Sequence, residues 1–460
     1  GVIVGNPQNG EIYAMASNHG FDLTDPDDLS DKYTDAELKS MTEEEKSDAL
    51  NEKWYNYCVS ESFEPGSTFK PIVVASALEM GAITTDATYV CDGGEFVTDT
   101  EIKCDNIYGH GNETLSDVIK NSCNDAMMQI GMKMQITPFL KYQRLFNFGS
   151  RTGIDLPNES TGVLYDRDSM HEVELATNTF GQTFTSTMIQ EYAAFNAVVN
   201  GGYYYEPHMV DKITNSSGAT VQNIEPRVLR QTISESTSAK IRQYCRATVM
   251  EEGGDRRTGR TARPAGYAIG GKTGTAETIP RKNGEYVVSF MGYAPADDPQ
   301  IAIYVVVDRA NASPQDDAKF ATGIVRNVLT EVLPYLNIFM TEELSEKEIQ
   351  ELAEKQIEIT NQYTQKPEDG EDQNNGDGTG DGQTGDDQTG SGDGTGDGQG
   401  GDDSTPSEDW RNYPVDPATG YLVSPIDGGL IDPVTGADVG GDDSLGDSPV
   451  NNNLLNQQNE

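Results

Sequence analysis

The sequence predicts an α+β fold in which helices pack on one antiparallel sheet. Three apolar runs follow one another late in the first 340 residues, and turn signals separate them. They are GYAIGGKTGTAET (266–278), YVVSFMGYAP (286–295) and IAIYVVVDRA (301–310). β-Branched and aromatic residues fill these runs, so we expect three consecutive antiparallel strands. Apolar helical segments occur before and after them, as expected for helices that cover a sheet.

The other elements follow from local signals along the chain. Residues 1–18 have apolar runs on both sides of an Asn-Pro-Gln-Asn-Gly turn, which predicts an opening hairpin. Residues 67–80 predict an apolar helix that ends at Gly81, because glycine readily adopts the left-handed conformation after a helix. The remaining expected helices are an acidic one at 34–50, two pieces in 114–134 that meet at 121–124, one at 185–200 before Gly201-Gly202, and one at 320–336.

Composition divides the chain into four parts. Residues 1–340 carry the predicted sheet and helices, and we expect them to form one folded body. Residues 341–365 predict a charged helical extension. Residues 366–409 consist almost wholly of Gly, Asp, Gln, Thr and similar polar residues, which bury too little apolar surface to fold, so we expect a disordered acidic linker. In residues 410–460, the motif Asp-Pro-x-Thr-Gly occurs twice and predicts two turns in a flexible tail.

The charge is strongly negative and unevenly placed. The formal net charge is −44; residues 367–460 hold 22 acidic residues against Arg411, which gives −21 there and leaves −23 for the rest. Both parts are acidic, so nucleic acid is not an expected partner, because phosphate binding requires a basic surface. No run of about twenty apolar residues could span a membrane. The chain starts inside a hairpin without an initiator Met, so we expect it to be a piece of something longer.

Five cysteines and four histidines are the candidates for disulfides or metal ligands. No two cysteines form a CxxC pair and the histidines are scattered, so we expect neither a zinc site nor another metal or cofactor. Cys91 and Cys104 flank a Gly- and Asp-rich segment and could close a short disulfide loop in an oxidising compartment. Two separate thiols are an equally good interpretation.

The first candidate for catalysis is Ser67 with Lys70, in the segment FEPGSTFKP (63–71). Residues three apart lie on one face of a helix, so the lysine can reach the hydroxyl. A serine needs an adjacent base to become a nucleophile, and a helix N-terminus adds a favourable field. Taken alone, the pair is better interpreted as a helix-capping serine beside a solvated lysine.

Two further motifs make a catalytic role for Ser67 and Lys70 a better interpretation. Ser122-Cys123-Asn124 lies between two helical pieces, where a hydroxyl and a carboxamide could face a cleft; alone, it is better interpreted as a helix break. Lys272-Thr273-Gly274-Thr275 lies on the first predicted strand. Thr273 and Thr275 alternate onto one face, Gly274 would let a ligand backbone approach, and Lys272 offers positive charge to a carboxylate.

Ser-x-x-Lys, Ser-x-Asn and Lys-Thr-Gly in this order resemble the signature of penicillin-binding proteins and, in its Ser-Asp-Asn form, of class A β-lactamases. Longer stretches resemble class B penicillin-binding proteins of the division and sporulation type. They include WYNYCVSESFEPGSTFKP (54–71), IKCDNIYGHGNETLSDVIKNSCNDAMMQIG (102–131) and FGQTFTSTMIQEYAAFNAVVNGG (180–202). The resemblance covers about residues 1–340 and implies the transpeptidase fold that these proteins share with serine β-lactamases.

The resemblance implies a serine D,D-transpeptidase that cross-links the stem peptides of peptidoglycan. Ser67 would form the acyl-enzyme, with Lys70 as general base. Ser122 and Lys272 would pass the proton to the leaving amine. The backbone amides of Ser67 and Thr275 would form the oxyanion hole. The residues that would bind the substrate are Asn124, Thr273, Gly274 and Thr275.

The resemblance also implies partners and a location. The donor would be a stem peptide ending in D-Ala-D-Ala, the acceptor an amine of a second strand, and β-lactams would acylate Ser67. A SEDS-type glycan polymerase and division proteins are the expected protein partners. The expected location is the extracytoplasmic face of the bacterial membrane, with the anchor upstream of Gly1.

Two other interpretations remain open at this point. In a D,D-carboxypeptidase or a β-lactamase, water would replace the acceptor amine. A β-lactam sensor or a non-catalytic module of a division complex would bind without turnover, although the intact Ser67, Lys70, Asn124 and Lys272 argue against a dead site.

Overall fold

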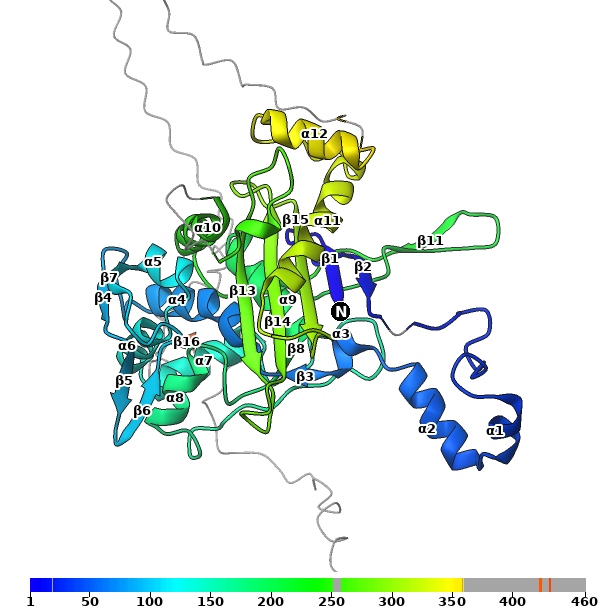
Figure 1. Ribbon diagram of the computed structural model, residues 1–460, viewed down its shortest axis with the longest axis horizontal. Coiled ribbons are helices and arrows are strands. Elements are labelled where there is room, and N and C mark those ends of the chain that lie inside the picture. Colours follow the sequence, from blue (N-terminus) through cyan, green and yellow to red (C-terminus); the bar gives the residue numbers. More distant parts are fainter. Residues whose placement is uncertain (19, 251–257, 358, 360–421, 424–429, 432–460) are drawn as a thin grey trace, which may run out of the picture. The chain divides into compact units, whose positions relative to one another are not determined.

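The computed structural model describes residues 1–18, 20–250, 258–357 and 359, together with the residue pairs 422–423 and 430–431 (Figure 1). Contacts divide the chain into two units, Gly1–Thr364 and Gln365–Glu460. The acidic linker and both Asp-Pro-x-Thr-Gly motifs lie outside the described residues. In the second unit, β16 (Leu422–Val423) pairs with β17 (Leu430–Ile431) as two antiparallel strands.

One five-stranded antiparallel sheet organises the first unit, in the order β13-β14-β15-β1-β2 (Figure 1). The three predicted strands are confirmed as β13 (Gly270–Glu277), β14 (Tyr286–Ala294) and β15 (Ile301–Asp308). The opening hairpin is confirmed as β1 (Val2–Gly5) and β2 (Ile12–Ala16). It extends the same sheet, because β1 pairs with β15 some 300 residues later, with Val2 opposite Val305. Strands from the beginning and from the later part of the first unit therefore form one sheet.

Both faces of this sheet are covered. In β15, Tyr304 faces one apolar cluster, while its neighbours Ile303 and Val305 face another. The first cluster takes in α9 (Met188–Val199), which is buried along its whole length. The second takes in the apolar side of α11 (Lys319–Tyr335). This two-sided burial explains why the strands are apolar almost throughout instead of alternating with polar residues.

The helical layer on the first face carries the first two motifs. The predicted apolar helix is confirmed as the 3₁₀ turn η1 (Gly66–Phe69) followed by α4 (Lys70–Glu79), with Gly81 in the left-handed conformation. The predicted pair of helical pieces is confirmed as α5 (Leu115–Lys120) and α6 (Asn124–Met134). α10 (Glu235–Met250) packs on α4, α5 and β13. The other helices here are α3 (Tyr57–Ser60), α7 (Ile136–Leu145) and α8 (Glu172–Asn178).

The expected acidic helix at 34–50 is two helices, α1 (Asp35–Ser40) and α2 (Glu43–Lys53). The prediction of one helix was wrong because Thr42 starts a new one: its hydroxyl accepts from the Glu45 amide while the Glu45 side chain accepts from the Thr42 amide. Thr34 caps α1 in the same way. Both helices are largely exposed, as their composition predicts.

The charged extension at 341–365 contains one described helix, α12 (Glu346–Glu354). Its Leu352 is buried in the second cluster, and its Glu348 pairs with Arg263 at 2.7 Å. The helix is therefore part of the first unit and not a separate element. Within the described residues, no helix is both long and apolar enough to cross a membrane.

Short two-stranded ribbons complete the first unit. They are β3 (Ser62–Phe63) with β8 (Ser186–Thr187), β4 (Thr88–Cys91) with β7 (Gly111–Thr114), β5 (Gly94–Val97) with β6 (Thr100–Lys103), β9 (Tyr203–Tyr205) with β12 (Val228–Gln231), and β10 (Lys212–Thr214) with β11 (Thr220–Asn223); the 3₁₀ turn η2 spans Arg260–Ala262.

Candidate active site

Ser67 lies on a tight turn at the start of a buried helix. Gly66 has φ +63°, a conformation that favours glycine, and a Cβ there would lie 2.8 Å from the carbonyl oxygen of Thr275. Gly66 therefore lets η1 press against β13. Ser67 is half-buried in η1, and Lys70 begins α4 one turn later.

A second glycine, Gly181, packs against the same turn and accepts a hydrogen bond from it. The Gly66 amide donates to the carbonyl of Gly181 at 2.9 Å, and a Cβ on Gly181 would lie 2.0 Å from the Gly66 carbonyl oxygen. Gly181 also has φ +82°. Two backbones meet here with no room for a side chain, so Gly181 positions the turn that carries Ser67.

We expect Gly181→Ala to slow acylation of Ser67 by roughly 10- to 100-fold, because a shift of about 1 Å in a reacting group costs rates of this order. Gly81→Ala is the matched control: Gly81 has φ +70°, but a Cβ there would meet nothing within 4 Å. Backbone strain costs each variant about 1–2 kcal/mol of stability. Gly181→Ala also forces its Cβ against the Gly66 carbonyl oxygen, so only this variant should change the rate of labelling by a fluorescent penicillin. Equal rates for the two variants would contradict the positioning role.

Lys70 is fully buried and donates to two residues of the second motif, Ser122 and Asn124. Its Nζ lies 2.6 Å from the Ser122 carbonyl oxygen, 3.1 Å from Ser122 Oγ and 2.6 Å from Asn124 Oδ1. Burial lowers the pKa of Lys70, against the opposing charge of Asp105. Within the described residues, no hydrogen bond joins Lys70 to the Ser67 hydroxyl, so the predicted contact is not formed in this conformation. Such catalytic bonds are often long before the substrate binds.

Ser122 stands between the two motif lysines. Its Oγ accepts from Lys70 at 3.1 Å and from Lys272 at 2.9 Å. Its φ is +58°, which costs a non-glycine residue on the order of 1–2 kcal/mol. The turn between α5 and α6 thus holds a strained backbone so that one hydroxyl meets both lysines.

Lys272 lies on β13 and is also fully buried. Burial and the nearby Lys70 lower its pKa well below the usual value for lysine. Two buried ammonium groups that share one hydroxyl repel each other, so the pair favours a state in which one lysine is neutral. A neutral amine next to Ser122 is a group that can accept a proton.

Asn124 is already engaged inside the protein. Its Oδ1 accepts from Lys70, and its Nδ2 donates to Asp105 Oδ1 at 3.3 Å. Substrate binding by Asn124 stays a prediction. Asp105 was not singled out in the sequence, because it lies among several other acidic residues in a loop without periodic pattern.

The third motif borders the Ser67 turn. Thr273 is buried and Thr275 is exposed on the same face of β13. A Cβ on Gly274 would lie 2.3 Å from Ser289 Oγ and 3.1 Å from the Pro65 carbonyl oxygen. The closeness that glycine permits here is therefore to the Ser67 turn itself; contact of Gly274 with a ligand stays a prediction.

Glu64 ties the turn to the hairpin between β13 and β14, and the sequence did not point to it. The carboxylate is buried, pairs with Arg281 and accepts from the Thr183 amide at 3.0 Å. The ion pair joins residues 217 positions apart, which no local pattern could reveal.

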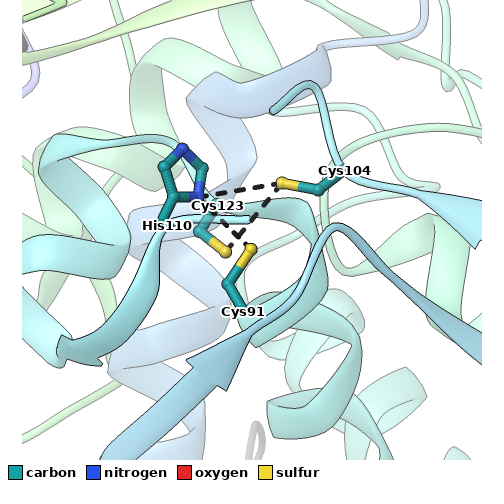
Figure 2. Close-up of side chains that lie close together, drawn as sticks. All are labelled: Cys91, Cys104, His110 and Cys123. Carbon is teal, nitrogen blue, oxygen red and sulfur yellow. Dashed lines mark hydrogen bonds between the residues drawn. The ribbon is translucent and has the colours of Figure 1, made fainter. Parts of the chain in front are cut away.

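The cysteines agree with one of the two interpretations that the sequence left open. All five are free thiols, so the disulfide considered for Cys91 and Cys104 is not formed. Both sulfurs instead face His110, and Cys123 completes a cluster whose four ligand atoms all lie within 4.8 Å of one another (Figure 2). The expectation of no metal site rested on the absence of CxxC pairs. It is put in question because the fold gathers ligands that are far apart in the chain.

Comparisons with known proteins show the family to which the chain belongs. The family described as penicillin binding protein transpeptidase domain matches residues 1–330. The chain is 37% identical over 366 residues to stage V sporulation protein D of Bacillus subtilis, covering 77% of this chain and 52% of that protein. It is 28% identical to the peptidoglycan D,D-transpeptidase MrdA of Acinetobacter baumannii, covering 66% of this chain and 47% of that protein. The chain thus spans about half the length of these curated relatives.

A solved structure supports the fold. Penicillin-binding protein 3 of Mycobacterium tuberculosis, solved in complex with aztreonam, superposes with a TM-score of 0.62 at 24% identity, over 75% of this chain and 74% of that one. The expected transpeptidase fold, with mixed helices and an antiparallel sheet, is therefore confirmed.

Proposed function

Because the chain belongs to the penicillin-binding protein transpeptidase family, we propose that it is a serine D,D-transpeptidase that cross-links peptidoglycan stem peptides. One observation carries this proposal: the hydroxyl of Ser122 accepts from two fully buried lysines, Lys70 and Lys272. Lys70 begins the helix that follows the Ser67 turn, and Lys272 belongs to the strand that borders it. The arrangement provides a nucleophile, a base and a proton path in one place.

In the proposed acylation step, Ser67 Oγ attacks the carbonyl carbon of the penultimate D-Ala. Neutral Lys70 takes the hydroxyl proton as the O–C bond forms. The amides of Ser67 and Thr275 stabilise the oxyanion, and the close approach of Gly66 to Thr275 supports their placement side by side. The C–N bond then breaks, and the terminal D-Ala amine leaves with a proton passed through Ser122 from the lysine pair.

The second step transfers the acyl group. An amine of a neighbouring strand attacks the Ser67 ester, loses a proton to the lysine pair, and forms the new amide as Ser67 regains its proton. Burial lowers the pKa of each lysine, which supports these proton transfers because it favours the neutral amine that accepts a proton. Thr273 and Thr275 would hold the substrate carboxylate, with Asn124 on a substrate amide.

The proposed setting follows from the relatives. Both curated relatives described above are about twice as long as the matched region, which leaves room for an anchor and further domains in such proteins. We place the site on the extracytoplasmic face of the membrane, where peptidoglycan is assembled. A SEDS-type glycan polymerase and division proteins are the partners we propose.

Mass spectrometry of nascent peptidoglycan tests the reaction. The chain, expressed with its native upstream segment in cells depleted of the endogenous enzyme, should increase the fraction of cross-linked stem peptides. The same chain with Lys272→Ala should not, and the exposed Lys282→Ala on the neighbouring hairpin should behave as wild type. Stem peptides that are only trimmed would identify a D,D-carboxypeptidase. Acylation without any change in stem peptides would identify a sensor.

A further inference from the structure

Four side chains from separate segments converge under the turn that carries Ser122. Cys91 ends β4, Cys104 follows β6, His110 precedes β7, and Cys123 is the N-cap of α6. Three sulfurs and one imidazole nitrogen point toward a common centre (Figure 2). All three cysteines are buried, and the His110 side chain is 11% exposed.

The distances between these atoms suit a tetrahedral metal ion. Cys91 Sγ lies 3.4 Å and Cys104 Sγ 3.9 Å from His110 Nδ1, and Cys104 Sγ lies 4.0 Å from Cys123 Sγ. With zinc–sulfur bonds of about 2.3 Å and zinc–nitrogen bonds of about 2.0 Å, tetrahedral geometry separates ligand atoms by about 3.5–3.8 Å. A disulfide would need its sulfurs at about 2.05 Å. The observed separations match shared ligation better than pairing.

The backbone around the cluster is shaped to hold it. Gly109 has φ +77°, and a Cβ there would lie 2.3 Å from the Cys91 carbonyl oxygen. The Cys104 amide donates to the Gly93 carbonyl at 2.9 Å. These contacts fold the loop between Cys91 and His110 tightly back on itself. The ligands are therefore brought together by backbone contacts.

A buried carboxylate lies beside the cluster. Glu113 is 1% exposed, and its Oε1 accepts from Asn121 Nδ2 at 2.8 Å. Its Oε2 is buried without a hydrogen-bond partner, 3.8 Å from His110 Nδ1. A buried carboxylate oxygen without a partner is costly.

We propose that Cys91, Cys104, His110 and Cys123 bind one Zn²⁺ ion. Binding would release three thiol protons, and neutral imidazole would supply the fourth ligand, so the metal and its ligands would carry a net charge of −1. Thiolate-rich sites select zinc over harder ions. Four protein ligands leave no open position, which makes the site structural and not catalytic.

The site would position the second catalytic motif. Cys123 lies between Ser122 and Asn124, and Asp105, which accepts from Asn124, follows Cys104 directly. A metal bond to Cys123 would hold the strained backbone of Ser122 in place. This consequence rests on the proposed function, whereas zinc binding itself does not.

Metal analysis of the purified full chain tests zinc binding without reference to activity. We expect about one zinc per chain after gel filtration under reducing conditions, released when a mercurial reagent titrates the thiols. Cobalt exchanged into the unmutated chain should show thiolate charge-transfer bands and tetrahedral d–d bands. Cys104→Ser should lose the metal, and Cys58→Ser, a buried cysteine outside the cluster, should keep it. The cobalt spectrum decides the matter even if Cys104→Ser fails to fold.

Two results would overturn the proposal. One is a reduced, folded chain that takes up no zinc or cobalt from solution. The other is a Cys91–Cys104 disulfide, found by mass spectrometry of unreduced peptides, in a chain without metal. If zinc is bound but its removal leaves penicillin acylation unchanged, the positioning role fails; if acylation is absent in the zinc-bound chain, the proposed function fails.

Discussion

The Ser67→Ala variant is expected to lose covalent labelling by a fluorescent penicillin, by a factor of at least about 10⁴ in acylation rate. Ser67 Oγ is the atom that we propose forms the ester, and alanine leaves nothing to acylate. The side chain is half-buried and makes no hydrogen bond to Lys70, so its removal should leave the fold intact. Gel fluorescence after incubation with the labelled β-lactam, with circular dichroism for folding, measures both points.

Ser217→Ala is the matched control, because Ser217 lies exposed in the turn between β10 and β11. It should label at the wild-type rate. Labelling that survives in Ser67→Ala would remove Ser67 as the nucleophile. In a companion variant, Lys70→Ala should acylate far more slowly while keeping Ser67, and acylation at the normal rate would remove Lys70 as the base.

The sheet and helices were predictable where the signal is local. The strands at 270–308 are long, apolar and rich in β-branched residues, and Gly81 marks the end of its helix as expected. The pairing of β1 with β15 was not predictable from pattern, because it joins segments some 300 residues apart. The break at Thr42 was missed, because a capping box inside a continuous acidic pattern does not change the helical period.

The sequence singled out the residues of the candidate site but did not predict their contacts. The three motifs named Ser67, Ser122 and Lys272 as candidates. In the structure, Ser122 and Lys272 are in direct contact. Local spacing suggested that Lys70 would contact Ser67, yet the lysine reaches across to Ser122 and Asn124. The reason is burial: a lysine that is fully enclosed must donate to whatever acceptors line its pocket.

The cysteine cluster shows the limit of spacing rules most clearly. Ligands in short zinc motifs come from one turn, so a CxxC pair is a reliable signal. Here the four candidate ligands are separated by segments that form β5, β6, β7 and α5. Only the folded ribbons bring His110 next to Cys91, so spacing alone could not reveal this cluster, and metal binding itself stays a proposal.

The second large effect concerns stability and comes from Glu191. This residue lies on α9 and is fully buried; its Oε1 accepts from Ser186 Oγ at 3.2 Å, and its Oε2 has no hydrogen-bond partner. Burial raises the pKa of Glu191 from 4.5 to about 8. Since the folded state binds this proton more tightly than the unfolded state, Glu191 costs stability once the pH exceeds 4.5. The loss grows until about pH 8 and then levels off.

We therefore expect Glu191→Gln to stabilise the protein in alkaline solution and to matter little in acid. At 1.36 kcal/mol per pKa unit, the gain above pH 8 is roughly 3–5 kcal/mol. Urea unfolding of wild type and variant between about pH 4.5 and 8.5 would show two curves that coincide in acid and separate as the pH rises. The exposed Glu44→Gln should follow wild type throughout. Parallel curves for Glu191→Gln and wild type would mean that Glu191 does not change its protonation on unfolding. Its buried carboxylate would then be stabilised by a group beyond its bond from Ser186.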